Sequence, residues 1–446
     1  MKTQFNKKTA YPILASIAAL MVLTGCGSSV APISGSSDNA AGSTGNGNGS
    51  SSSSSGSSSS SSSGSVTPTA TGSTTSAGVT VTTPWTNARL AEGDDHSCLL
   101  DISGGVWCWG YNNSGQLGNG TTTNGKYLAR VETLTSGAVM VAAGGDHTCA
   151  LDSSNGVWCW GANESGELGN GSYTGSTVPV RVSGLSSGVQ ALAVGFQHTC
   201  AIDATSTLWC WGSNSYGQLG NNSVSNSDVP VQVSGFSGGA VALALGYHHS
   251  CATDTNGALW CWGFNNSGRL GDGTTTNRLV PTAVSGLSSG VLAVSAGYVN
   301  TCAVDSSDAL WCWGANEYGQ LGTGGSAGGT LTPVMVSAVT IGIQTLSLGG
   351  YHVCVTDGGT NVQCWGYNYY GQVGTGSYSV GQPTPLTVSE VSGPVRGLAL
   401  GGYHTCVLDG TGMQCWGDDY YDQLGDGTYS NSTVPVQVYK VEPPQS

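Results

Sequence analysis

Short apolar segments alternate with turns rich in glycine, asparagine and serine between about residue 85 and residue 440. The segment 191–195, Ala-Leu-Ala-Val-Gly, is typical, because a two-residue turn separates it from the next apolar stretch. Runs this short, bounded by turn residues, are characteristic of β-strands. No segment after the first thirty residues has the apolar periodicity of a helix. The pattern therefore predicts an all-β protein.

The strand pattern repeats seven times, and the first cysteine of each unit recurs after 51, 51, 51, 51, 52 and 52 residues. A typical unit has an apolar stretch, His-x-Cys with Asp three residues after the cysteine, Cys-Trp-Gly, a Gly-Gln-Leu-Gly turn and a closing strand that contains proline. Four short strands per unit are typical of a propeller blade, and one blade cannot cover its own faces. We therefore predict a seven-bladed β-propeller of four-stranded antiparallel blades over residues 84–440.

This repeat, with its His-x-Cys-x-x-Asp and Cys-Trp-Gly-x-Asn-x-x-Gly-Gln-Leu-Gly patterns, resembles the regulator-of-chromosome-condensation repeat. The resemblance covers residues from about 85 to 440 and implies the same propeller fold. It implies less about activity, because the family includes nucleotide exchange factors, photoreceptors, ligase-associated domains and a secreted bacterial β-lactamase inhibitor.

Fourteen cysteines follow Cys26, and they fall into one pair per unit with nine residues between the partners, or eight in the last unit. Cysteines at this spacing can face each other across a two- or three-residue hairpin turn. We therefore predict seven disulfides within blades. The pairs are Cys98 with Cys108, Cys149 with Cys159, Cys200 with Cys210, Cys251 with Cys261, Cys302 with Cys312, Cys354 with Cys364, and Cys406 with Cys415.

Other recurring residues are expected to be structural. One tryptophan per unit favours packing between blades, with a carbohydrate platform as the alternative. The histidine before each first cysteine is replaced by Asn300 in unit five, which a metal site would tolerate badly. Asp272 and Asp426 lie in Gly-Asp-Gly sequences that indicate turns more than calcium. Because no catalytic motif is present, we expect a protein that is not an enzyme and has no cofactor or metal.

The first 25 residues have a basic start, an apolar run and small residues, as in a secretory signal peptide. The sequence Leu23-Thr24-Gly25-Cys26 resembles the lipobox of bacterial lipoproteins, which implies that Cys26 is lipidated; a stray cysteine after an ordinary signal is the alternative. Residues 26–83 are predicted to form a disordered Ser/Gly-rich linker, and 441–446 a tail. We expect a lipid anchor in the cell envelope, in the outer membrane rather than the inner one, with surface exposure as an option.

The formal net charge of −14 becomes −17 once Lys2, Lys7 and Lys8 leave with the signal peptide. A chain with only eleven basic residues is a poor candidate for nucleic acid, which needs basic patches. We therefore expect no nucleic-acid partner, and a monomer.

The positions that break the repeat lie between the first strand of each unit and its His-x-Cys sequence. Aromatic residues fill five of these seven turns, and acidic residues fill the first two. Such a surface suits a protein partner, or a cell-wall or extracellular glycan, while packing against the next blade is the alternative. The candidate partner-binding residues are Asp94, Asp95, Asp146, Phe196, Gln197, Tyr247, His248, Tyr298, Tyr351 and Tyr403.

If these rings are free to bind, replacing Tyr247 and Tyr298 with alanine should remove binding without lowering the melting temperature. A second variable set follows the Gly-Gln-Leu-Gly turn and is rich in Tyr, Ser, Gly and Asn, a composition that suits recognition loops. Units six and seven add a tyrosine cluster nearby, formed by Tyr367, Tyr369, Tyr370, Tyr420 and Tyr421.

Overall fold

The computed structural model describes residues 79–80, 89–410 and 412–440. The expected signal peptide, Cys26, most of the expected linker and the tail at 441–446 lie outside these residues. All regular elements that the structure describes are β-strands. This part of the chain therefore includes no helix that could span a bilayer.

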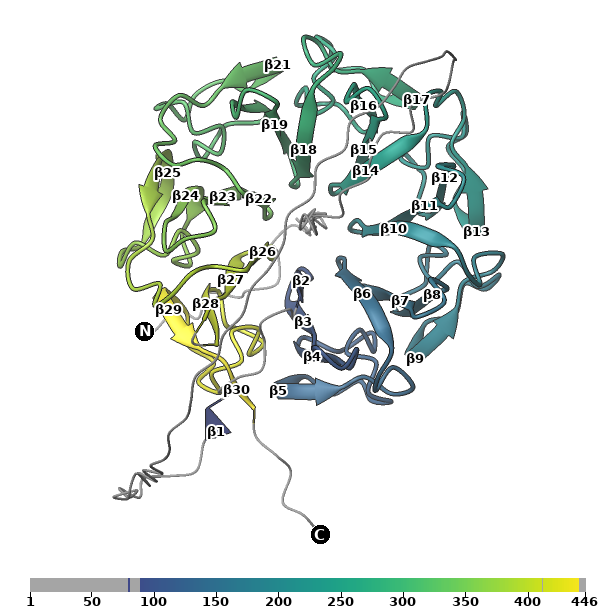
Figure 1. The fold of residues 1–446 in the computed structure, drawn as a ribbon, viewed down its shortest axis with the longest axis horizontal. Helices are drawn as coiled ribbons and strands as arrows, with labels where there is room; N and C mark the ends of the chain where they lie inside the picture. The colour runs from purple at the N-terminus through teal and green to yellow at the C-terminus, as the bar shows by residue number, and fades with distance from the viewer. Residues whose placement is uncertain (1–78, 81–88, 411, 441–446) are drawn as a thin grey trace, which may run out of the picture. The chain divides into compact units, whose positions relative to one another are not determined.

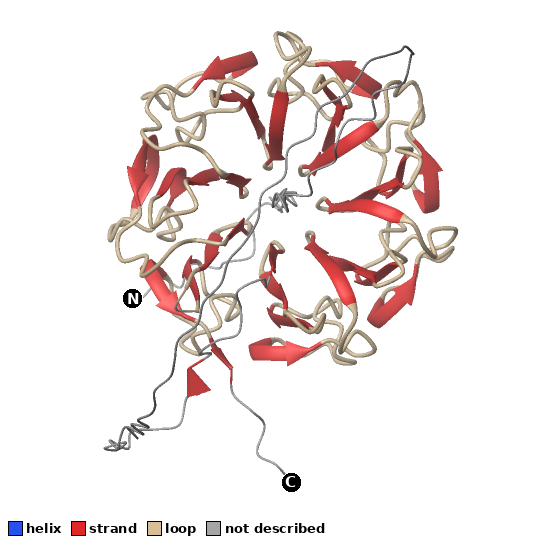
Figure 2. Cartoon of the chain, in the orientation of Figure 1, coloured by secondary structure: helices blue, strands red, loops and turns tan. Residues whose placement is uncertain are grey.

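Seven four-stranded antiparallel sheets are arranged around a central axis as the blades of a propeller (Figures 1 and 2). Each blade uses four consecutive strands, ordered from the axis outward as they occur in the chain. The predicted all-β, seven-bladed fold is confirmed.

The strands fall into four concentric sets. The innermost strands are β2 (Arg89–Glu92), β6 (Ala138–Ala143), β10 (Val189–Val194), β14 (Ala240–Leu245), β18 (Val291–Ala296), β22 (Thr345–Leu348) and β26 (Gly397–Leu400). The second strands are β3 (His96–Leu100), β7 (His147–Asp152), β11 (His198–Asp203), β15 (His249–Asp254), β19 (Asn300–Asp305), β23 (His352–Thr356) and β27 (His404–Leu408). The third strands are β4 (Val106–Gly110), β8 (Val157–Gly161), β12 (Leu208–Gly212), β16 (Leu259–Gly263), β20 (Leu310–Gly314), β24 (Val362–Asn368) and β28 (Met413–Gly417). The outer strands are β5 (Gly125–Arg130), β9 (Ser176–Arg181), β13 (Ser227–Gln232), β17 (Arg278–Ala283), β21 (Thr330–Met335), β25 (Ser379–Thr387) and β29 (Ser432–Gln437).

A short strand pair lies outside the blades, where β1 (Val79–Thr80) is antiparallel to β30 (Tyr439–Lys440). The strand β1 falls within 26–83, the range expected to be a linker. Each blade is contiguous in sequence, so blades 1 and 7 close the ring by side-to-side contact of β2 with β26 and β27.

The cysteines of each blade lie directly opposite each other on the second and third strands. In blade 2, Cys149 pairs in register with Cys159, and their Cα atoms are 4.1 Å apart. This close spacing is that of a non-hydrogen-bonded antiparallel pair, which is short enough for a disulfide. All seven pairs predicted from the sequence are bonded in this way.

The turn between the second and third strands is organised by the recurring aspartate. Asp101 Oδ1 accepts hydrogen bonds from the backbone amides of Ser103 and Gly105, and its Oδ2 accepts one from Trp107 Nε1 at 2.8 Å. Hydrogen bonds of the same kind lower the pKa of Asp152 and of Asp305 to about 2, against the cost of burial. These aspartates are therefore structural, as expected.

Neighbouring blades are joined by a repeated set of buried polar contacts. Trp160 of blade 2 is fully buried against blade 1 and donates its Nε1 hydrogen to the Gln116 carbonyl oxygen of blade 1 at 2.8 Å. The Thr148 hydroxyl donates to the same carbonyl and lies 2.9 Å from His96 Nε2. The recurring tryptophans and histidines thus stabilise the joints between blades.

One joint departs from this set. Asn300 of blade 5 stands where the other blades have histidine, and Val353 of blade 6 stands where the others have a hydroxyl. Both side chains are fully buried, and the Asn300 amide has no hydrogen-bond partner on either polar atom. The loss of the histidine in one blade is therefore accompanied by the loss of its partner in the next.

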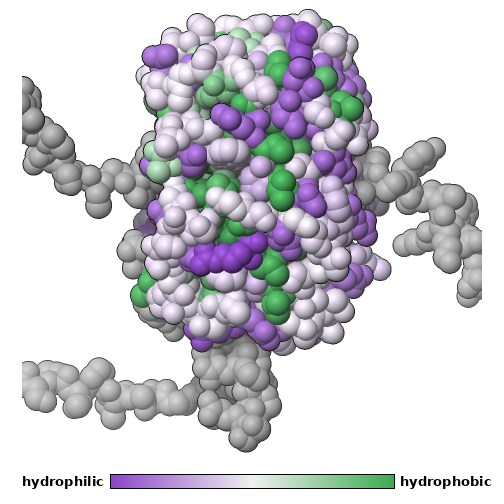
Figure 3. All heavy atoms as spheres, turned by 90° about the vertical axis from the view of Figure 1, so that its right-hand side faces the viewer, coloured by the Kyte–Doolittle hydropathy of each residue, from purple (hydrophilic) through white to green (hydrophobic). Residues whose placement is uncertain are grey.

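The side wall of the disc is formed by the outer strands. In the view of Figure 3 its described surface is largely of intermediate hydropathy, and apolar groups are separated by polar ones. Val229 on β13, for example, is exposed and lies between Asp228 and Pro230 in the chain. Scattered residues of this kind are normal at a protein surface and indicate no interface.

Candidate binding face

Two sets of connections lie on the same face of the disc. Because the strands are antiparallel, the turn from the first to the second strand and the loop from the third to the outer strand leave each blade at the same end. The candidate turns found in the sequence are the first set, and the loops after Cys-Trp-Gly are the second. We call this end the loop face.

The seven turns from the first to the second strand, which we call the inner turns, have the same length. In each of them two residues lie between the glycine that follows the first strand and the His or Asn that begins the second strand. We call the first of these two residues the inner position and the second the outer position. The inner positions hold Asp94, Gly145, Phe196, Tyr247, Tyr298, Gly350 and Gly402. The outer positions hold Asp95, Asp146, Gln197, His248, Val299, Tyr351 and Tyr403.

The inner side chains pack against one another near the axis. Phe196 stacks on Tyr247, with ring centroids 4.6 Å apart, and both belong to one apolar cluster with Tyr298. Glycine at three of the other four inner positions provides the room. A Cβ on Gly145 would lie 2.1 Å from the Phe196 ring, and a Cβ on Gly350 would lie 2.5 Å from the Tyr298 ring.

A hydrogen bond crosses this cluster between two blades that are not neighbours. Tyr298 of blade 5 donates its hydroxyl hydrogen to Asp94 Oδ1 of blade 1 at 2.6 Å. Burial raises the pKa of the Tyr298 hydroxyl well above its ordinary value, so that it remains a donor. Gly402 lies beside this bond, since a Cβ there would be within 2.4 Å of both oxygens.

The inner positions are less accessible than the sequence analysis expected. Asp94, Phe196 and Tyr298 are only 7%, 4% and 1% exposed. The expectation that these residues form a free surface is wrong, because their side chains fill the centre of the face and contact each other. Asp95, Asp146, Gln197, Tyr247, His248, Tyr351 and Tyr403 are half-buried and remain candidates for contact with a partner.

Carboxylates gather on the part of the loop face formed by blades 7, 1 and 2. Gln116 Nε2 donates to Asp146 Oδ1 at 2.9 Å, and Gln423 Nε2 donates to Asp418 Oδ2 at 3.2 Å. Burial, opposed by the Tyr298 hydrogen bond and assisted by the nearby charges of Asp146 and Asp418, raises the pKa of Asp94 to about 7. This acidic sector continues into a small pocket lined by Asp146, Glu164, Glu167, Phe196 and Gln197.

Tyrosines gather on the adjoining part of the face, over blades 6 and 7. Tyr369 and Tyr420 are 60% and 72% exposed, unlike the rings of the inner turns. Beneath them, Tyr370 contacts Tyr403, and Tyr367 stacks with Tyr369 at a centroid distance of 6.3 Å. The tyrosine cluster noted as the weaker signal in the sequence thus provides the most exposed rings of this face.

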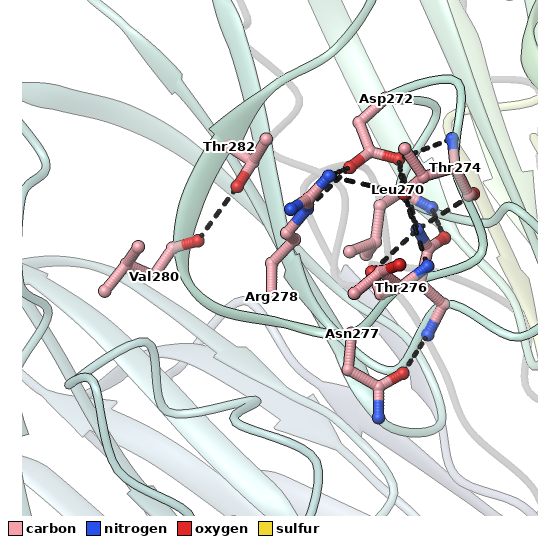
Figure 4. Close-up of polar contacts among 9 residues, drawn as sticks. Leu270, Asp272, Thr274, Thr276, Asn277, Arg278, Val280 and Thr282 are labelled. Atoms are coloured by element: carbon pink, nitrogen blue, oxygen red, sulfur yellow. Dashed lines mark hydrogen bonds and ion pairs between the residues drawn. The ribbon is translucent and has the colours of Figure 1, made fainter.

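In blades 1 to 6, the loop between the third strand and the outer strand is held by one asparagine. In blade 4, the Asn265 amide donates to the carbonyl oxygens of Thr274 and Thr276, and its Oδ1 accepts from the Leu270 amide. Figure 4 shows this loop, in which the Arg278 guanidinium also faces Asp272 at 2.6 Å. Asp272 therefore has an internal partner, in agreement with its interpretation as a turn residue.

A buried arginine supports the central turns of the face. Arg269 of blade 4 replaces the recurring glutamine, and its guanidinium donates to the Tyr298 carbonyl oxygen and to Asn266 Oδ1, both at 2.6 Å. It also lies 4.7 Å from the centroid of the Phe264 ring. The loop face thus has an acidic part, an exposed aromatic part and a buried arginine that supports the central turns.

Comparison with known proteins agrees with this architecture. The RCC1-like domain family matches residues 33–354, and the regulator of chromosome condensation (RCC1) repeat matches residues 361–408. The ultraviolet-B receptor UVR8 of Arabidopsis thaliana is 30% identical over 354 residues, which cover 78% of this chain and 80% of the receptor. The human E3 ubiquitin-protein ligase HERC2 is also 30% identical, over 77% of this chain but only 7% of the ligase.

Solved structures show the same fold. Prp20p from Saccharomyces cerevisiae superposes with a TM-score of 0.68 at 21% identity, covering 76% of this chain and 87% of Prp20p. Human WBSCR16 superposes with a TM-score of 0.67 at 23% identity, covering 75% of this chain and 93% of WBSCR16. From its repeats, its blades and these relatives, the chain belongs to the RCC1-like domain family.

Proposed function

We propose that this propeller is a non-catalytic binding module that uses its loop face to bind a protein partner. The observation that carries the proposal is the pair of exposed rings, Tyr369 and Tyr420, above a layer of half-buried tyrosines. Tyrosine combines a large apolar area with a polar hydroxyl, and it is enriched among the residues that dominate protein–protein binding energy.

The acidic sector adds charge selectivity to this surface. Asp95, Asp146 and Asp418 are half-buried or nearly buried, and described Lys and Arg residues form no ion pair with them. A partner with basic side chains would supply the missing charge and would be attracted at a distance. We therefore expect a basic surface on the partner, opposite blades 7, 1 and 2. Prp20p has binding properties to Gsp1p and histones, which is a precedent for protein binding by such a propeller.

The test is binding to a partner captured from the native cell envelope and then purified. Replacing both Tyr369 and Tyr420 with alanine should weaken binding about tenfold or more without lowering the melting temperature, since hot-spot rings contribute about 2 kcal/mol or more. Tyr173→Ala is the matched control, because Tyr173 is 52% exposed but lies on the blade 2 loop. Equal affinities of the double variant and the control would contradict the proposal.

A glycan is the alternative ligand, because exposed tyrosine rings also stack on sugars. A glycan array probed with the same proteins separates the two ligand classes. Sugar-competed binding that disappears in the tyrosine double variant would favour the lectin function over protein binding.

The cellular location belongs to the same proposal. We infer a lipid-anchored envelope protein from the lipobox-like sequence ending at Cys26, which lies outside the described residues. Growth with a labelled fatty acid should label the protein and place it in the membrane fraction, and Cys26→Ser should remove both properties. Unchanged labelling of the variant would contradict the anchor.

A further inference from the structure

The loop that joins β28 to β29 in blade 7 has aspartate at three positions. Two of these aspartates occur in no other blade, and the third position holds aspartate only here and in blade 4, as Asp272. Asp419 replaces the loop-holding asparagine, Asp422 replaces the first glycine of Gly-Gln-Leu-Gly, and Asp426 corresponds to Asn119 of blade 1. One carboxylate oxygen from each of these three side chains lies within 4.8 Å of the other two. Three negative charges are therefore brought together where the other blades have mainly neutral groups.

The first substitution removes an amide donor from the centre of the loop. In blade 1 the Asn112 Nδ2 group donates to the carbonyl oxygens of Thr121 and Thr123. The corresponding oxygens of blade 7 belong to Thr428 and Ser430, and Asp419 has no hydrogen to donate to them. Asp419 Oδ1 still accepts from the Leu424 amide at 2.9 Å, so its side chain keeps the position of the asparagine, and its Oδ2 accepts from the Ser430 amide at 3.0 Å. A bound cation would replace the positive end of the missing amide.

The second substitution buries a carboxylate that lacks a hydrogen-bond donor. Asp422 is 1% exposed, and neither of its carboxylate oxygens has a donor in hydrogen-bond geometry, although Tyr429 lies near enough to lower its pKa. Its φ of 63° is in the left-handed region, where the other six blades use glycine. A buried carboxylate without a donor is costly and points to a positively charged ligand.

The nearby Lys126, whose Nζ lies 5.1 Å from the centroid of the Tyr429 ring, acts on Asp422 at a distance but forms no ion pair with the cluster. In blade 4, Asp272 is neutralised by Arg278, but blade 7 has Ser432 at the position of that arginine. Among the described residues, none of the three aspartates of blade 7 forms an ion pair.

We propose that Asp419, Asp422 and Asp426 bind one divalent cation, with calcium preferred. The three carboxylates offer oxygen ligands, and hard cations are bound by such ligands. Calcium accepts irregular arrangements of six to eight oxygens, whereas magnesium requires a near-ideal octahedron. An irregular loop with carboxylates from three positions suits calcium better. Asp419 and Asp422 flank the proposed partner-binding Tyr420 in the same loop, but calcium binding can be measured on the chain alone, without a partner.

The test is calorimetric titration of the full chain with CaCl₂ after treatment with EDTA. We expect one calcium per chain and a higher melting temperature in calcium than in EDTA. The triple variant Asp419→Asn/Asp422→Gly/Asp426→Asn restores the residues that blade 1 has at these positions. It should fold with all seven disulfides and should have lost both responses. Asp426→Asn alone, at a half-buried position, should weaken calcium binding by about tenfold or more.

The matched control is Asp272→Asn, which removes the aspartate of the other Gly-Asp-Gly sequence and should leave calcium binding unchanged. Three results would overturn the proposal. These are no response of the unmodified chain to millimolar calcium, an equal response of the triple variant, or the same loss in the Asp272 variant. Binding of MgCl₂ as tight as that of CaCl₂ would overturn the preference for calcium.

Discussion

The Tyr298 hydroxyl donates a hydrogen bond to Asp94 across the centre of the propeller, between residues 204 positions apart in the chain. The bond connects blade 5 with blade 1, whereas the other buried polar contacts described above connect neighbouring blades. The bond therefore restrains the ring of seven blades across its centre. It also occupies the space that an open central channel would need at this face.

The first prediction concerns this bond. Tyr298→Phe keeps the ring in its apolar cluster but leaves the buried Asp94 carboxyl without its donor. Loss of one partner of a buried hydrogen bond costs about 1–3 kcal/mol, and chemical denaturation should measure a decrease of that size in the free energy of unfolding. Tyr369→Phe, at an exposed ring, should change it by less than about 0.5 kcal/mol. Equal effects of the two variants would show that the bond does not contribute.

The second prediction concerns the pH dependence that Asp94 causes. Its pKa is raised from 3.8 to about 7 in the folded protein. A raised carboxyl pKa means that the folded state binds the proton more tightly than the unfolded state. The contribution to stability is therefore complete below about pH 4 and is lost as the pH rises to about 7.

Asp94→Asn removes this titration and keeps an oxygen to accept from Tyr298. The variant should gain stability relative to the unmodified chain by at most about 1.4 kcal/mol per pH unit between about pH 4 and pH 7, with no further gain above that range. Denaturation curves of both proteins at four pH values would measure the difference. A difference that is constant across the range would contradict the raised pKa.

The third prediction concerns the disulfides. Each closes a loop of about ten residues, which should contribute about 2–3 kcal/mol by restricting the unfolded chain. Replacing both Cys149 and Cys159 with alanine should decrease the free energy of unfolding by about this amount. Digestion of the non-reduced protein should yield only pairs within one blade. Peptides linked between blades, or free cysteines, would contradict the arrangement.

Most of the fold could be predicted because the repeat makes each feature visible seven times. Cys149 and Cys159 show this well, since their spacing and the hairpin turn between them determine that they face each other. Asp101 and Trp107 likewise recur at positions whose partners lie within the same hairpin. The geometry of a single hairpin is sufficient to predict such contacts.

The candidate site was harder to predict because its contacts cross the axis. The turns of blades 2, 6 and 7 differ from the others by a glycine at the inner position, which in the sequence resembles the end of the preceding strand. The room that Gly350 and Gly402 make for Tyr298 was therefore not predicted. Whether an aromatic turn residue is exposed or buried depends on side chains from distant blades, which a repeat alignment does not place near it.

The last prediction uses the joint between blades 5 and 6, where Asn300 and Val353 replace the usual histidine and hydroxyl. Gly297 keeps the glycine against which the imidazole packs in other blades, and the Gln320 carbonyl oxygen still accepts from Trp365 Nε1 at 3.0 Å. The space and the acceptor for the missing pair are therefore present. Asn300→His together with Val353→Thr should restore the contact seen between His96 and Thr148.

A double-mutant cycle should give a favourable coupling of about 1 kcal/mol between these two substitutions. Asn300→His alone should be neutral or destabilising, because its ring nitrogen would face Val353 without a partner. Val353→Thr alone should gain little, because the hydroxyl would reach the Gln320 carbonyl but no imidazole. Thermal unfolding of the four proteins measures the coupling, and additive effects would mean that the histidine–hydroxyl contact does not stabilise the joint between blades.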